Sequence, residues 1–163
     1  MTTKKNGPSV YDLTLESFSK SINGCFICRN CMKGTHQRAI TGEPETVCTL
    51  YEYNGRDKIY SSQNLWQTAK SILYSGMKIS PALTDLLYQC TTCGQCTEQC
   101  VVCHINDHRA NQYNLVEFLR SEMVKKGYGI PIHLKFGEHI QKEHNPYIEK
   151  HTDRWNWLPT KKE

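Results

Sequence analysis

Cys90-Thr91-Thr92-Cys93-Gly94-Gln95-Cys96-Thr97-Glu98-Gln99-Cys100 is the stretch from which the rest of the chain can be interpreted. Its cysteines follow the spacing C-x2-C-x2-C-x3-C, which is typical of iron–sulfur ligands. Three thiolates two residues apart can surround one face of a cubane cluster, and a cysteine three residues further on is free to reach a second cluster. The motif therefore predicts an iron–sulfur site.

The same cysteine triplet occurs upstream as Cys25, Cys28 and Cys31, and a single Cys48 follows it. Two triplets and two outlying cysteines supply eight thiolates, the number that two [4Fe–4S] clusters require. In two-cluster ferredoxins the fourth cysteine of each group binds the cluster of the other group. The predicted ligands are Cys25, Cys28, Cys31 and Cys100 for the first cluster and Cys90, Cys93, Cys96 and Cys48 for the second.

Zinc is the alternative metal, because it also takes soft thiolate ligands. Structural zinc sites use paired C-x2-C knuckles, so the third cysteine of each triplet would have no role in a tetrahedral site. The spacing thus favours clusters, and the alternative is a zinc-binding structural or nucleic-acid interaction protein.

The ninth cysteine, Cys103, leaves a choice open. It is either a small buried side chain or a substitute fourth ligand in place of Cys100. With Cys100 and His104 it forms C-x2-C-H, the attachment signature of a c-type haem, although Cys100 is already claimed by a cluster. His104 and His108 stand at i and i+4, where they could bind a metal on a helix or form hydrogen bonds near a cluster.

Composition indicates that buried cofactors or a partner surface supply part of the core. Only 38% of the 163 residues are hydrophobic, and the formal net charge is +4. Eight thiolates around two oxidised cubane cores of about +2 each would add about −4, so the basic excess offsets cofactor charge. Because no basic block with interleaved aromatic residues occurs, we expect no nucleic-acid partner.

The N-terminal residues 1–8 lack the apolar region of a signal peptide, and no stretch approaches eighteen consecutive apolar residues. We therefore expect a cytoplasmic protein without a membrane span, either free or peripheral to a membrane complex, with its cysteines reduced. The chain shows no phosphate loop, nucleophile elbow or informative pair of carboxylates, which predicts a non-catalytic role.

The apolar periodicity predicts an all-α fold of short helices around the cofactors. Between residues 46 and 61 the chain alternates around Asn54-Gly55, which in isolation is a hairpin signal. Aromatic side chains such as Trp66, Tyr113 and Phe118 should pack between helices or shield clusters from water. The expected helices are 9–23, ending at Gly24; 62–75; one from Ser80-Pro81 into Cys90; 110–126, with Leu115, Val116, Leu119, Met123 and Val124 inward; and 131–143.

Residues 9–127 are expected to form the two-cluster domain, and residues 128–163 a helical and extended segment for partner docking. The stretch between Cys31 and Cys48, with Thr41-Gly42-Glu43-Pro44, is typical of an irregular surface loop, and the tail 160–163 of disorder.

Several segments together resemble the iron–sulfur module of the heterodisulfide reductase C-type polypeptide, over residues 20–127. The chain is similar as well to the iron–sulfur subunits of glycolate oxidase and anaerobic glycerol-3-phosphate dehydrogenase. His144-Asn145-Pro146-Tyr147, with Arg154-Trp155, looks like the connector that in fused relatives leads into a cysteine-rich CCG domain, and the chain ends where that domain would start. The segments that carry the resemblance are Cys48-Thr49-Leu50-Tyr51, Gly55 to Tyr60, Gly76 with Ser80-Pro81, and Leu87 to Cys100.

This resemblance implies an α-helical ferredoxin fold whose two [4Fe–4S] clusters relay electrons between a flavin or iron–sulfur subunit and a CCG-type catalytic subunit. The chain departs from the family at two points. Thr49 and Val101 replace the usual proline after the fourth cysteine, and the x3 spacing of the first group is stretched to x16.

Overall fold

The computed structural model describes residues 12–33, 46–105, 111–147 and 149–158, and in these residues it is all-α, as predicted. The elements in chain order are η2 (Leu15–Phe18), α1 (Ser19–Gly24), α2 (Asn30–Lys33), α4 (Thr49–Tyr53), α5 (Ser62–Tyr74), α6 (Leu83–Tyr88), α7 (Gln95–Glu98), α8 (Val101–Ile105), α9 (Gln112–Lys125), α10 (Pro131–Glu143) and η3 (His151–Trp155).

Long helices α5 and α9 form the centre of the body, and each begins at a polar cap. Ser61 Oγ accepts from the Asn64 N–H at 3.2 Å to start α5, and Asn111 Oδ1 accepts from the Asn114 N–H at 2.9 Å to start α9. Such caps satisfy N–H groups that the first helical turn leaves free. The two helices pack against each other, and η2, α1 and α6 pack around them.

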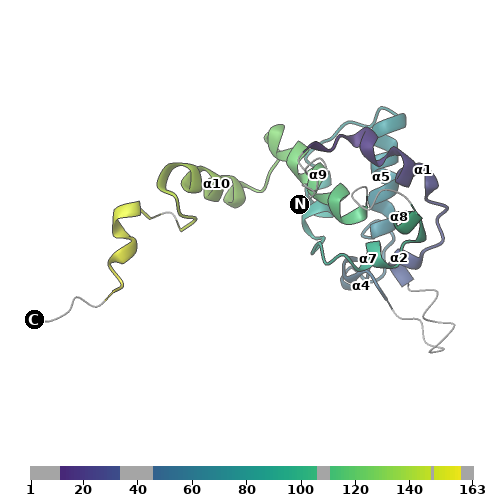
Figure 1. The fold of residues 1–163 in the computed structure, drawn as a ribbon, viewed down its shortest axis with the longest axis horizontal. Coiled ribbons are helices and arrows are strands. Elements are labelled where there is room, and N and C mark those ends of the chain that lie inside the picture. Colours follow the sequence, from purple (N-terminus) through teal and green to yellow (C-terminus); the bar gives the residue numbers. More distant parts are fainter. Residues whose placement is uncertain (1–11, 34–45, 106–110, 148, 159–163) are drawn as a thin grey trace, which may run out of the picture.

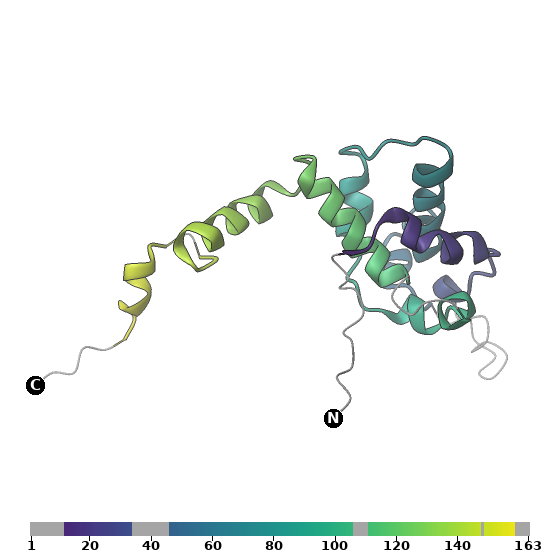
Figure 2. The same cartoon turned by 45° about the horizontal axis from the view of Figure 1, so that its top comes forward.

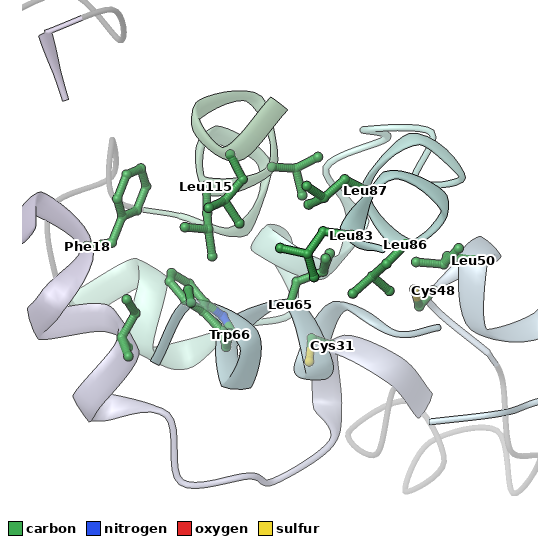
Figure 3. Packing of buried hydrophobic residues seen from close by; sticks show 14 of the residues in the cluster. Phe18, Cys31, Cys48, Leu50, Leu65, Trp66, Leu83, Leu86, Leu87 and Leu115 are labelled. Carbon is green, nitrogen blue, oxygen red and sulfur yellow. The ribbon is translucent and has the colours of Figure 1, made fainter. Parts of the chain in front are cut away.

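The hydrophobic core lies between these helices (Figure 3). Trp66 and Leu65 of α5 occupy its middle, with Phe18 and Leu115 on one side and the leucines of α6 on the other. Of the side chains expected to face inward from α9, four are buried, whereas Val124 is 44% exposed because it lies at the end of the helix. Cys31 and Cys48 are also buried in this hydrophobic core.

Helix α10 extends away from this body. It leaves after the end of α9, carries no buried residue, and points with η3 into solvent (Figures 1 and 2). Pro131 is its first residue, as expected from the sequence, since proline needs no hydrogen-bond partner at that position. No helix in the described part of the chain is both long and apolar enough to cross a bilayer.

The hairpin that the alternation between residues 46 and 61 would signal in isolation does not form. Residues 49–53 form helix α4, and Asn54 and Gly55 end it, with Gly55 at φ +64°. The Asn54 side chain donates to the Leu50 carbonyl at 2.9 Å and to Gln89 Oε1 at 2.9 Å. A sequence suited to a tight turn is therefore used as a helix end, because contacts with a distant segment decide the outcome.

Two predicted boundaries also shift. The helix expected from Ser80-Pro81 begins at Leu83, after a turn in which the Ser80 and Pro81 carbonyls accept from Leu83 and Thr84. In the first predicted helix, residues 15–18 are 3-10 and only residues 19–24 are α. The described residues do not include Val10, Thr41-Gly42-Glu43-Pro44, His108, Ala110 or the tail 160–163, so the expectations for them lie outside the structure.

Candidate cluster-binding site

The two cysteine triplets share one backbone conformation. In each C-x2-C-x2-C unit the third and fifth residues have positive φ: Ile27 at 60° and Arg29 at 69° in the first, Thr92 at 52° and Gly94 at 78° in the second. Side chains branched at Cβ rarely adopt this region, and such strained residues cluster at functional sites. The repeat seen in the sequence is therefore also a repeat of local structure, with strain at the third residue of each unit.

Hydrogen bonds repeat in the same way. The Arg29 carbonyl accepts from the N–H groups of Met32 and Lys33, both at 2.9 Å, and starts α2. The Gly94 carbonyl accepts in the same manner at the start of α7. Consequently the third cysteine of each triplet, Cys31 or Cys96, is the second residue of a short helix.

The fourth cysteines also occupy equivalent places. Cys48 directly precedes α4 and Cys100 directly precedes α8, so Thr49 and Val101 are first residues of helices. Proline is favoured at the first position of a helix because the N–H that it lacks would have no partner there, but other residues can take its place. The two departures from the family pattern are therefore compatible with the same local geometry.

A first cavity is lined by Cys25, Cys28, Cys31 and Cys100. Cys100 reaches the upstream triplet because α8, which follows it, packs against α1, the helix that leads into Cys25. The Ser62 hydroxyl of α5 donates to the Cys31 carbonyl at 2.9 Å and holds that end of the cavity.

A second cavity is lined by Cys48, Cys90, Cys93 and Cys96. Two contacts hold Cys48 beside the downstream triplet. The hydroxyls of Thr49 and Thr91 lie 3.3 Å apart, and the Asn54 amide of α4 donates to Gln89, immediately before Cys90. The cavities therefore group the eight cysteines as the crossed scheme expects, three from one triplet and one from the other group.

All nine cysteines lie in the described residues, and all are free thiols. Burial raises the pKa of Cys31 to about 12 and also raises the pKa values of Cys25, Cys90 and Cys96. Buried thiolates crowded together need compensating positive charge, and iron supplies it. Backbone N–H groups of Ile27 and Thr92 partly oppose the rise at Cys25 and Cys90, again at equivalent positions. The donor set and its surroundings thus suit a thiolate-bound cluster in each cavity.

Cys103 is buried and does not line either cavity. Its Sγ donates to Gln112 Oε1 at 3.0 Å. Its backbone N–H donates to the Cys100 carbonyl at 3.0 Å, so Cys103 follows Cys100 by one helical turn. The haem-type C-x2-C-H segment forms the start of α8, where His104 Nε2 is 2.8 Å from the Glu98 carbonyl.

Arg120 of α9 is hydrogen-bonded to the backbone that leads into the second cavity. Its guanidinium donates to the Leu87 carbonyl at 2.7 and 3.1 Å and to the Cys90 carbonyl at 2.5 Å. It also stands over the Tyr88 ring and pairs with Glu117. These bonds satisfy carbonyls at the end of α6 and fix the backbone at the first cysteine of the motif.

Sequence reasoning missed Gln112 and Arg120. Gln112 gives no signal, since glutamine is ordinary at a helix start. Arg120 gives a weak signal, because it follows Val116 by four residues and so lies toward the buried side of α9.

Of the aromatic residues, Trp66 packs in the core, Phe118 packs against Phe18, and Tyr113 lines the second cavity. In the described residues, no three histidine, cysteine or acidic side chains are arranged to hold a single metal ion.

The fold and the two cavities define a helical protein with two four-cysteine sites. Comparison with known proteins finds similar chains among heterodisulfide reductase subunits and iron–sulfur proteins. The chain is 28% identical to the D-type polypeptide of dihydromethanophenazine:CoB–CoM heterodisulfide reductase from Methanosarcina mazei, over 95% of this chain and 37% of that relative. The same polypeptide from Methanosarcina acetivorans is 29% identical, with the same coverage. An uncharacterized iron–sulfur protein of Methanocaldococcus jannaschii is 25% identical over 90% of this chain and 27% of its own length.

The resemblance to iron–sulfur subunits of heterodisulfide reductase is thereby confirmed, and it extends beyond residues 20–127 to most of the chain. The named relatives are of the D type, whereas the sequence motifs suggested the C type. This chain spans little more than a third of the length of those reductase relatives. No family model matches the chain, and no solved structure matches it.

Proposed function

We propose that this chain is an electron-transfer subunit that carries two [4Fe–4S] clusters in a heterodisulfide reductase-like oxidoreductase. The observation that carries the proposal is the pair of cavities, each lined by four cysteines and built on the same strained backbone turn. Named relatives that are reductase subunits and iron–sulfur proteins support it.

In this proposal Cys25, Cys28, Cys31 and Cys100 hold the first cluster, and Cys48 joins the downstream triplet to hold the second. When bound, a cubane cluster takes up or releases one electron at a time. The chain's own residues bind the iron, donate backbone N–H groups to the sulfurs and limit the access of water. In this role the chain carries electrons, and the bond chemistry on the substrate belongs to a partner subunit.

We further propose that residues 128–163 form a docking segment. Ile132, Phe136 and Ile140 follow one another at intervals of four residues on α10, and all three are exposed. Such a stripe is the pattern of a helix that buries its apolar face against a partner. The expected partners are a CCG-type catalytic subunit and a flavin or iron–sulfur subunit.

The position of α10 relates this segment to the second cavity. The ring centroids of His133 and Tyr88 lie 5.7 Å apart, and His133 and Cys90 line the same surface groove. A partner held on α10 would therefore approach the second cluster first, which makes that cluster the exit or entry point for electrons on this side.

Anaerobic purification followed by iron, sulfide and zinc analysis tests the proposal. We expect about eight irons and eight sulfides per chain and a brown protein with a broad visible absorption. Two zinc ions without sulfide would instead establish the zinc-binding alternative.

Single substitutions test the crossed ligand scheme. Cys48→Ala should disturb the electron paramagnetic resonance signal of the cluster on the downstream triplet, and Cys100→Ala that of the other cluster. Cys103→Ala is the matched control and should retain both signals. Loss of the upstream cluster in Cys48→Ala would refute crossed ligation, and loss of a cluster in Cys103→Ala would make Cys103 a ligand.

A further inference from the structure

Gln112 is a buried amide at the junction of the two cysteine cavities. Its side chain is 1% exposed, and among the described residues it alone lines both cavities. It is the first residue of α9, where the Asn111 cap fixes the backbone. The amide is therefore held in place by a long, well-packed helix.

Cys103 sets the orientation of this amide. Its Sγ donates to Gln112 Oε1 at 3.0 Å, and the Gln112 backbone is hydrogen-bonded to the same sulfur. With the oxygen held by Cys103, the NH2 group is left for other acceptors. Cys103 donates its N–H to the Cys100 carbonyl at 3.0 Å, and Gln112 and Cys100 line the same cavity, so the amide lies on the Cys100 side of the first cavity.

The Nε2 atom of Gln112 completes no hydrogen bond with any described part of the chain. A buried donor without an acceptor is costly, so native structures rarely keep one unless a ligand, ion or water supplies the partner. Sulfur atoms of a bound cluster and its cysteines are such acceptors. Hydrogen bonds to these sulfurs stabilise the more negative, reduced state and so raise the reduction potential.

We propose that Gln112 is a positioning residue that raises the potential of the first cluster by donating its side-chain N–H to the Cys100 sulfur, with Cys103 holding the amide in that orientation. This inference rests on the proposed function, because it requires a cluster on Cys25, Cys28, Cys31 and Cys100. It also gives the ninth cysteine a role other than ligation.

Gln112→Met tests the inference, since methionine has similar length and no N–H. In a redox titration followed by electron paramagnetic resonance, the equilibrium constant for reduction of the first cluster should fall about tenfold, which is 59 mV for one electron. The second cluster should shift less. Gln63→Met, in the wall of the first cavity but half-buried, is the matched control and should shift the potential less than Gln112→Met does. An unchanged first cluster, an equal shift of both clusters or an equal effect of Gln63→Met would overturn the inference.

Substitutions at Cys103 decide the matter if Gln112→Met fails to load its clusters. Cys103→Ala frees the amide and should lower the first potential in the same direction, whereas Cys103→Ser should restore it, because a hydroxyl can still donate to Oε1. Loss of the first cluster in Cys103→Ala, or no difference between these two variants, would refute the positioning role.

Iron and sulfide analysis of the unmodified chain separates this inference from the proposed function. A chain without clusters would end both. A fully loaded chain whose potentials ignore Gln112 and Cys103 would end the inference and leave the electron-transfer proposal standing.

Discussion

Replacing Arg120 by methionine should destabilise the body of the protein, because it removes the donor that serves the Leu87 carbonyl of α6 and the Cys90 carbonyl just beyond the helix. The guanidinium donates to the Leu87 carbonyl at 2.7 and 3.1 Å and to the Cys90 carbonyl at 2.5 Å, and its side chain is 18% exposed. Methionine keeps the apolar part of the side chain and loses the hydrogen-bond donors together with the positive charge.

The magnitude follows from these contacts. Hydrogen bonds from a charged donor contribute about 1.5–3 kcal/mol each, and water can partly replace them at the surface. Two carbonyls that lose their partner should therefore cost about 2–4 kcal/mol. The half-exposed pair with Glu117 adds no more than about 1 kcal/mol. For a chain of this size each kcal/mol lowers Tm by about 2–4 °C, so a drop of at least about 4 °C is expected.

Thermal unfolding of the anaerobic holoprotein, followed by circular dichroism at a fixed scan rate, measures this effect. The Tm of Arg120→Lys should fall between those of the unmodified protein and Arg120→Met, because a single ammonium lacks the planar fork with which the guanidinium reaches both carbonyls. Lys125→Met removes an exposed cation from the same helix and is the control, with a change of about 0.5 kcal/mol or less. A Tm for Arg120→Met equal to that of Lys125→Met would refute the assigned role of Arg120.

Three further substitutions probe the helix cap, the core and the docking segment. Ser61→Ala removes the cap of α5 and should cost about 1 kcal/mol, seen as a lower Tm; Ser75→Ala, at the other end of the helix, is the comparison, and equal effects would contradict the capping role. Leu119→Ala opens a cavity in the buried face of α9 and should cost about 2–5 kcal/mol; a loss below about 1 kcal/mol would mean that this side chain is not core. Phe136→Asp should weaken co-purification with the partner subunits while iron content and Tm stay unchanged, because α10 contributes nothing buried to the body; retained co-purification would argue against docking through this face.

Local signals predicted the helices whose ends depend on a single cap or stop. The cap at Ser61 and proline at 131 set α5 and α10, and both begin where the sequence indicates. The hairpin signal at Asn54-Gly55 is misleading in isolation, because the role of these residues depends on Gln89, thirty-five residues away. The shape of a turn is a local property, but the choice between a hairpin and a helix end is decided by packing.

The same contrast holds at the candidate site. Cysteine spacing, read with the pattern of two-cluster ferredoxins, predicted which four cysteines would line each cavity. The supporting groups could not be predicted, because Gln112 and Arg120 act on cavities formed by segments far from them in sequence. Their types are common on helices, and only the folded chain shows that their polar atoms face the cysteines.

The crossed supply of the fourth cysteine has a consequence for assembly. Neither half of the chain supplies all four cysteines of a cavity, because the fourth cysteine of each cavity comes from the other half. In the proposed two-cluster protein, binding of one cluster would hold the two halves of the chain together and bring the cysteines of the other cavity into place, so the first cluster inserted should favour the second. When iron is scarce, such a protein should divide into fully loaded and empty molecules, with few that carry a single cluster.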